Sequence, residues 1–169
     1  MLGRLYLVVT PRPGWSLEAT LDRTERALAG GVEVVQLRAK DWEARPTLAL
    51  GERMLALARR YGVPFFLNDR PDLAALLGAD GVHLGQDDLP ISYARRLMGP
   101  GKIIGLSTHN AAQVREAVTA QPDYVGFGPI FSTSTKADHD PVVGLEGLRA
   151  ARALTTLPMF AIGGITAES

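Results

Sequence analysis

The sequence contains no cysteine and no long apolar run. Without cysteine the chain has neither disulfides nor thiol chemistry, which is typical of a cytoplasmic protein. The first apolar run, Leu5–Val9, is too short for a signal peptide or a membrane span, so we expect neither. The formal net charge is zero, from 18 basic and 18 acidic residues. No overall field therefore favours nucleic acid or an anionic membrane, and any anion-binding site must be a local cluster.

Lysine is also scarce, because Lys40, Lys102 and Lys136 are the only lysines in the chain. Lys40 and Lys136 both lie in polar segments that follow apolar runs. A compact ammonium group suits a phosphate oxygen, so these two residues are candidate phosphate ligands. The chain does have ample apolar material, with 169 residues of which 46% are hydrophobic. That is enough for one sizeable core, and we expect a single domain over residues 1–169.

Short apolar runs alternate with longer segments of helical period, and this alternation predicts parallel strands joined by helices. Ser16 is a candidate helix N-cap, and Pro71 suits the first turn of another helix. Further helices are expected at Ile91–Met98, Ala111–Thr119 and Leu145–Leu154. The seven expected strands are Leu5–Val9, Val32–Leu37, Pro64–Leu67, Gly81–Leu84, Ile103–Leu106, Tyr124–Phe127 and Met159–Ile162.

So regular a series favours a TIM (β/α)₈ barrel over an open doubly wound sheet. A closed barrel needs eight strands, and an unclosed one exposes two sheet edges. We therefore expect either that the last βα unit is missing from this sequence or that the sheet is open.

Polar residues gather just after these strands, where parallel α/β folds place their active sites. In "VVQLRAKD", Gln36, Arg38 and Lys40 alternate with apolar residues, so a strand period puts all three side chains on one face. A cationic pair pointing into a barrel mouth is costly unless an anion meets it. The alternative is that the strand ends at Arg38 and both cations are solvated.

Acidic residues follow the next two strands. Asn68 and Asp69 come after one of them, and Asp87 and Asp88 come after its neighbour. Each group could simply cap the following helix. Two carboxylates on neighbouring loops could instead share one Mg²⁺ ion, which commonly keeps substrate phosphates among its ligands. These residues alone do not choose between Asp87 and Asp88.

The last three strand ends carry hydroxyl groups, an ammonium group and glycines. "GLSTHN" offers Ser107 as a cap or ligand and His109 as a surface residue or a proton carrier. "FGPIFSTSTK" places hydroxyls and backbone N–H groups before Lys136, a suitable set for phosphate. Gly163 and Gly164 lie where phosphate-binding barrels put backbone N–H donors. The predicted rim therefore suits two phosphorylated groups and a divalent metal.

Six motifs together resemble the thiamine-phosphate synthase (thiamine-phosphate pyrophosphorylase) family, in the family's order and over nearly the whole chain. The resemblance implies a Mg²⁺-dependent TIM barrel that joins the diphosphate ester of 4-amino-5-hydroxymethyl-2-methylpyrimidine to 4-methyl-5-(2-phosphoethyl)thiazole. Its partners would be these small phosphorylated molecules, and a homo-oligomer is compatible with it. The motifs are "QLRAKD", "FLNDRPDLA", "GADGVHLGQDDLP", "IIGLSTHN", "DYVGFGPIFSTSTK" and "MFAIGGIT".

The resemblance also implies a role for individual residues. Asp69 and Asp88 would be the Mg²⁺ ligands, and Arg38, Ser107 and Lys136 would act in catalysis at the diphosphate. Ala39 stands where the family usually has glutamate, and Ser132 where it often has proline. Gln36, Arg38, Lys40, Asn68, Ser107 and Lys136 would bind the pyrimidine diphosphate, while Thr133, Thr135 and Gly164 would bind the thiazole phosphate.

Two other functions fit part of the pattern. A thiazole tautomerase on the same barrel would use His109 for proton transfer, but the retained diphosphate-binding and metal-binding set favours the synthase. A non-catalytic protein that binds thiazole phosphate or thiamine phosphate would have no use for a metal pair.

Overall fold

The computed structural model describes residues 2–133, 141–166 and 168–169, and it contains seven parallel strands that alternate with six helices in this part of the chain. Successive strands are hydrogen-bonded neighbours, in the order β1 to β7. The elements are β1 Tyr6–Val9, α1 Leu17–Ala29, β2 Val34–Leu37, α2 Ala44–Arg60, β3 Phe65–Asn68, α3 Pro71–Leu77, β4 Gly81–Leu84, α4 Ile91–Met98, β5 Ile103–Thr108, α5 Ala111–Ala120, β6 Tyr124–Phe127, α6 Gly144–Ala153 and β7 Met159–Ala161.

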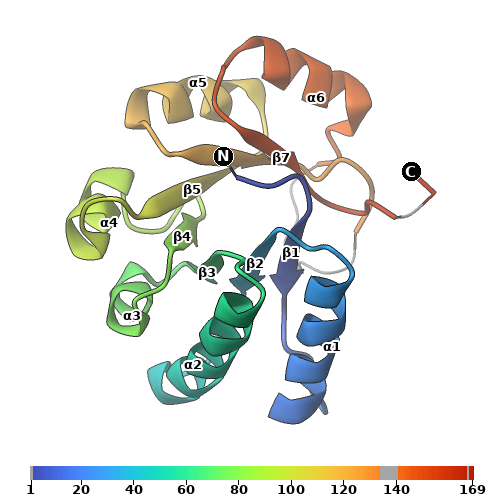
Figure 1. The fold of residues 1–169 in the computed structure, drawn as a ribbon. Helices are drawn as coiled ribbons and strands as arrows, with labels where there is room; N and C mark the ends of the chain where they lie inside the picture. The colour runs from blue at the N-terminus through green and yellow to red at the C-terminus, as the bar shows by residue number, and fades with distance from the viewer. Residues whose placement is uncertain (1, 134–140, 167) are drawn as a thin grey trace.

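The sheet curls into a nearly closed barrel with the helices outside it (Figure 1). Its two end strands approach each other across the interior, because Tyr6 on β1 packs edge-on against Phe160 on β7 with ring centroids 5.0 Å apart. An open doubly wound sheet would hold these strands far apart, so the barrel prediction is confirmed. That an eighth βα unit is missing from the sequence stays a prediction.

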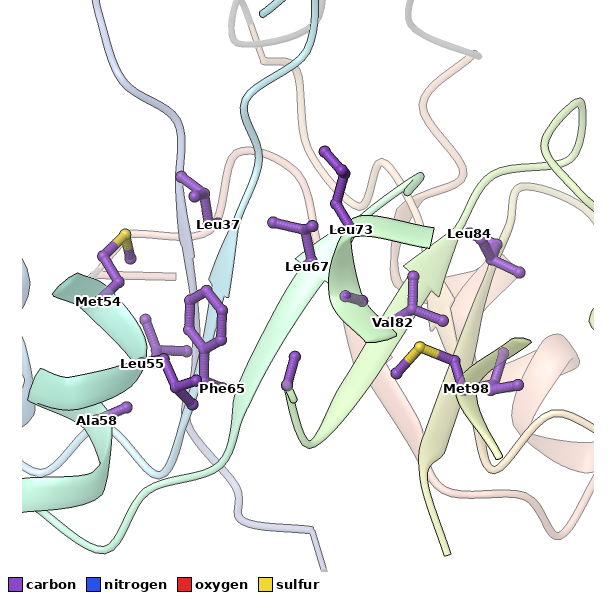
Figure 2. Packing of buried hydrophobic residues seen from close by; sticks show 14 of the residues in the cluster. Leu37, Met54, Leu55, Ala58, Phe65, Leu67, Leu73, Val82, Leu84 and Met98 are labelled. Atoms are coloured by element: carbon purple, nitrogen blue, oxygen red, sulfur yellow. The ribbon is translucent and has the colours of Figure 1, made fainter. Parts of the chain in front are cut away.

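Two apolar layers hold the barrel together, and the strand period assigns residues to them. Val35 and Leu37 of β2 point outward into the layer between sheet and helices, where Leu50 and Met54 of α2 are fully buried. Figure 2 shows Leu37 and Met54 in this layer. Val34, which precedes Val35 in the strand, points to the opposite face and packs in the interior layer with Phe66 and Tyr124. The alternation expected for β2 is therefore confirmed.

Local sequence sets where the helices begin and end. The Ser16 side chain accepts a hydrogen bond from the Ala19 N–H at 3.1 Å and caps α1, as predicted. Pro71 is in the first turn of α3, and Gly78 ends that helix in the left-handed conformation, with φ +66°. In the described ranges, no helix combines the length and apolar character needed to cross a membrane.

Glycine on the interior face of β5 makes room for an aromatic ring. A Cβ added to Gly105 would overlap the ring of Tyr124, a fully buried residue on β6. We expect Gly105→Ala to lower the free energy of unfolding by about 3 kcal/mol or more, because a packed interior cannot shift to admit the methyl group. Urea unfolding of the purified variant measures this change.

Gly126→Ala is the matched control, since a Cβ there would lie 3.3 Å from the nearest atom of the His83 ring. We expect that variant to lose less than about 1 kcal/mol. Equal losses in the two variants would contradict the steric explanation, and adding Tyr124→Leu to Gly105→Ala should restore part of the stability.

Candidate active site

Charged side chains from three neighbouring strands meet at the carboxyl ends of the barrel strands. Arg38 follows β2, and its backbone N–H donates to the Val9 carbonyl at 2.8 Å, which continues the pairing of β1 and β2 by one residue. Asn68 ends β3 and Asp69 follows it, and Asp88 lies in the loop between β4 and α4. Parallel strands place all of these loops at one end of the barrel.

Asp69 and Asp88 form a carboxyl pair. Burial, together with the side chain and negative charge of Asp88, raises the pKa of Asp69 to about 7, so the two carboxyl groups lie close to each other. A second contact fixes each residue. The Asp69 N–H donates to the His83 carbonyl at 2.8 Å, and Asp88 Oδ2 accepts from the Gly85 N–H at 2.6 Å. The capping alternative is not what the structure has, because the N-cap residues of α3 and α4 are Arg70 and Pro90.

Two cations stand close to this pair. The positive charges of Lys40 and Arg38 lower the pKa of Asp69 and partly offset its burial and the effect of Asp88. This influence places both charges within electrostatic reach of the carboxylates. The strand period predicted for "QLRAKD" does not extend to Lys40, however, because β2 ends at Leu37 and Lys40 lies in the turn that follows. Arg38 is partly buried and Lys40 is exposed, so the ammonium group stays accessible to an incoming anion.

The structure also separates the two candidate aspartates of the β4–α4 loop. Asp88 is partly buried and faces Asp69, whereas Asp87 is exposed. The described residues contain no cluster of three or more acidic or histidine side chains that could hold a metal by itself. Two adjacent carboxylates nevertheless suit Mg²⁺, which takes one or two carboxylates and fills its other positions with substrate phosphates and water.

The glycine pair after β7 packs against the loop after β6. The N–H groups of Ile130 and Phe131 donate to the carbonyls of Ile162 and Gly163, each at 2.9 Å. Gly164 has φ +65°, and an added Cβ would overlap the backbone of this loop at Ser132, so glycine is required there. The same loop leads to Thr133. The structure therefore brings Gly164 to the segment that carries the predicted phosphate-binding hydroxyls, although Thr135 and Lys136 lie outside the described residues.

A chain of polar side chains crosses the barrel interior beneath the rim. Tyr6 on β1 and Tyr124 on β6 share a hydrogen bond of 2.8 Å between their hydroxyl oxygens, and Gln36 Nε2 donates to Tyr6 Oη at 2.8 Å. His83 continues the chain, with Nδ1 2.9 Å from Tyr124 Oη and Nε2 2.9 Å from Ser107 Oγ. Two predicted binding residues, Gln36 and Ser107, are its ends.

Burial keeps the side chains of this hydrogen-bonded series uncharged. Desolvation lowers the pKa of His83 to about 4, and it raises the pKa values of both tyrosines above their usual range. The sequence pattern did not single out either tyrosine. The glycines opposite the two ring types, Gly105 and Gly126, were the available sign that large side chains fill the interior there.

His109 lies at the end of β5 with a defined orientation. Its Nδ1 donates to the Gly128 carbonyl at 2.6 Å, and its backbone N–H donates to Gln113 Oε1 at 2.7 Å. The proton on Nδ1 leaves Nε2 as the basic atom of the neutral ring.

The fold is a TIM-like α/β barrel, a class whose enzymes carry their active sites at the carboxyl ends of the strands, where the carboxylate pair and the two cations lie here. The model of one such family, described as thiamine monophosphate synthase, matches residues 5–169. The chain therefore belongs to the thiamine monophosphate synthase family.

Similar proteins agree with this assignment. A protein of Thermus thermophilus named thiamine-phosphate synthase is 70% identical over 98% of this chain and 79% of its own length. A protein of the same name from Laribacter hongkongensis is 48% identical over 95% of this chain and 76% of its own. Among solved structures, thiamine phosphate pyrophosphorylase from Pyrococcus furiosus superposes with a TM-score of 0.84 and 36% identity, over 98% of this chain and 77% of that one.

Proposed function

We propose that this chain is a thiamine-phosphate synthase. It joins 4-amino-2-methyl-5-pyrimidinylmethyl diphosphate to 4-methyl-5-(2-phosphoethyl)thiazole and releases thiamine phosphate and pyrophosphate. The observation that carries the proposal is the Asp69–Asp88 pair beside Arg38 and Lys40. A site that combines two carboxylates with two cations suits a diphosphate that arrives with a divalent metal, whereas a lone phosphate needs no carboxylates.

The reaction asks little covalent chemistry of the protein. The bond between the methylene carbon and the diphosphate oxygen breaks, and its electron pair leaves with pyrophosphate. The electron-rich aminopyrimidine stabilises the resulting cation until the thiazole nitrogen donates its lone pair to the methylene carbon. The protein must therefore stabilise negative charge growing on the leaving group, which is a preorganised electrostatic task.

Each part of the rim has a role in this task. Arg38 and Lys40 lie beside the acidic pair and would neutralise the diphosphate. Lys136, which follows β6 in the sequence, would supply a third positive charge. Ser107 would donate its hydroxyl proton to the same group. Asp69 and Asp88 would hold Mg²⁺, which supplies positive charge to the diphosphate oxygens when bound.

The remaining residues would hold the two organic groups. Gln36 and Asn68 lie on the strands beneath the acidic pair and would contact the pyrimidine. The thiazole phosphate would bind where Gly164 meets the loop after β6, through backbone N–H groups and the hydroxyls of Thr133 and Thr135. In this proposal the thiazole would lie on the other side of the rim from the diphosphate, with its nitrogen free to approach the methylene carbon.

Incubation with both substrates and Mg²⁺ tests the function. We expect pyrophosphate and thiamine phosphate to form in equal amounts, and EDTA to stop the reaction. Ca²⁺-free Mg²⁺ added in excess over EDTA should restore it. Absence of product, together with proton exchange on a carboxylated thiazole phosphate that His109→Ala abolishes, would assign the chain to the tautomerases instead.

A further inference from the structure

The hydrogen bonds that cross the barrel interior all donate in one direction, and Gln36 fixes that direction. Gln36 Nε2 can only donate, so Tyr6 Oη must accept at this contact. Tyr6 then has a single proton, which is directed at its other partner, Tyr124 Oη. Tyr124 in turn donates its hydroxyl proton to His83 Nδ1. Each hydroxyl accepts from one side and donates to the other, and such chains reinforce themselves.

The imidazole ring of His83 continues this series of hydrogen bonds to Ser107 at the rim. With Nδ1 accepting from Tyr124, the neutral ring carries its proton on Nε2 and donates it to Ser107 Oγ at 2.9 Å. Ser107 then cannot direct its own proton at His83. Ser107 is on β5 and partly exposed, so this proton is available to an acceptor at the carboxyl end of the strand.

We propose that Tyr6, Tyr124 and His83 are positioning residues that make Ser107 an obligatory hydrogen-bond donor toward the rim. The role rests on the proposed function, in which the acceptor is a diphosphate oxygen whose charge grows as the carbon–oxygen bond breaks. A serine oriented before the substrate arrives need not reorganise during the reaction, which is what makes a donor effective.

The surrounding packing holds the chain in this one arrangement. Tyr124 is 1% exposed, and the bare face of Gly105 receives its ring. The His83 ring lies 3.3 Å from the position of an added Cβ on Gly126, so it packs closely against the bare face of that glycine. Gln36 is likewise buried, at 3% exposed. The rings therefore have little freedom to rotate out of line.

A pair of amide substitutions at position 83 separates positioning from mere packing. In His83→Gln the amide nitrogen can reach the place of Nε2 and still donate to Ser107, whereas the shorter side chain of His83→Asn reaches only the place of Nδ1. We expect His83→Asn to lower kcat about 10-fold to 100-fold with both KM values within about twofold, as for other residues that orient a ligand. We expect His83→Gln to retain kcat within about threefold of the parent, because the donor is kept.

The effect should pass through Ser107. In a Ser107→Ala background, His83→Asn should change kcat by less than about twofold, because the group it orients is gone. Urea unfolding of the two position-83 variants controls for folding. Equal kcat values for the glutamine and asparagine variants, or effects of positions 83 and 107 that multiply, would overturn the proposal.

A spectroscopic measurement tests the direction without any substrate. The chain has three histidines, so the ¹⁵N ring resonances of His83 can be assigned by their loss in His83→Gln. We expect the proton on Nε2, and a proton on Nδ1 would overturn the proposal. If the wild-type protein makes no thiamine phosphate, the proposed function fails, and this spectrum still decides the direction of the chain.

Discussion

Replacement of Asp88 by asparagine is expected to lower turnover on the order of 10²–10³-fold. A bound divalent cation contributes several kcal/mol to the stabilisation of a charged transition state, and asparagine removes one of its two anionic ligands. The fold should survive, since an amide oxygen can still accept from the Gly85 N–H as Asp88 Oδ2 does at 2.6 Å. Steady-state kinetics over a range of Mg²⁺ concentrations measure the loss, and the metal requirement should rise with it.

Asp87→Asn provides the matched control, because Asp87 is the neighbouring aspartate and is exposed. We expect its turnover and its Mg²⁺ dependence to equal those of the parent. Similar losses in the two variants would mean that charge in the loop matters and not coordination by Asp88. Asp69→Asn should reproduce the Asp88→Asn result, since the two carboxylates act as one site.

The single variant Lys136→Ala is expected to lower kcat on the order of 10²–10³-fold, which is typical for the loss of one preorganised donor to a developing anion. Lys136 lies outside the described residues, so this expectation rests on the position of the lysine after β6 and on the family resemblance. Single-turnover kinetics should show the loss in the chemical step. Near-normal turnover would remove Lys136 from the mechanism.

Lys102→Ala is the corresponding control, because Lys102 is a lysine with a structural role. Its ammonium group donates to the Ala79 carbonyl at 2.7 Å, near the start of β4 and therefore at the opposite end of the barrel from the rim. We expect this variant to lose stability and to keep its kcat. A large loss of kcat there would indicate that removing any lysine disturbs the enzyme.

Much of the barrel could be predicted because parallel strands and amphipathic helices leave periodic patterns. The β4 and β6 bounds and those of α4 agree with the prediction residue for residue. The meeting of Arg38 and Asp69 was also predictable, since every loop that follows a parallel strand lies at the same end of the sheet. The choice of Asp88 over Asp87 depends on which side chain turns inward, and a loop sequence does not specify that.

The hydrogen bonds in the barrel interior could not be predicted from the sequence, for a different reason. Tyr6 and Tyr124 are 118 residues apart, and their contact exists only because the sheet closes. A strand pattern shows which residues face inward but not which of them meet. His83 stood in an apolar strand with no polar neighbour in sequence, so nothing local distinguished a histidine in a hydrogen-bonded chain from one that simply fills space.

The contact between Gly105 and the ring of Tyr124 couples the residues that positions 105 and 124 can accept in evolution. A larger residue at position 105 is tolerated only after a smaller one has replaced Tyr124. That replacement would remove the hydroxyl group that joins β1 to β4. Enlargement at position 105 is therefore blocked until position 124 has changed, so the two positions should change together among relatives. Randomising both codons at once would show which pairs of residues the barrel accepts.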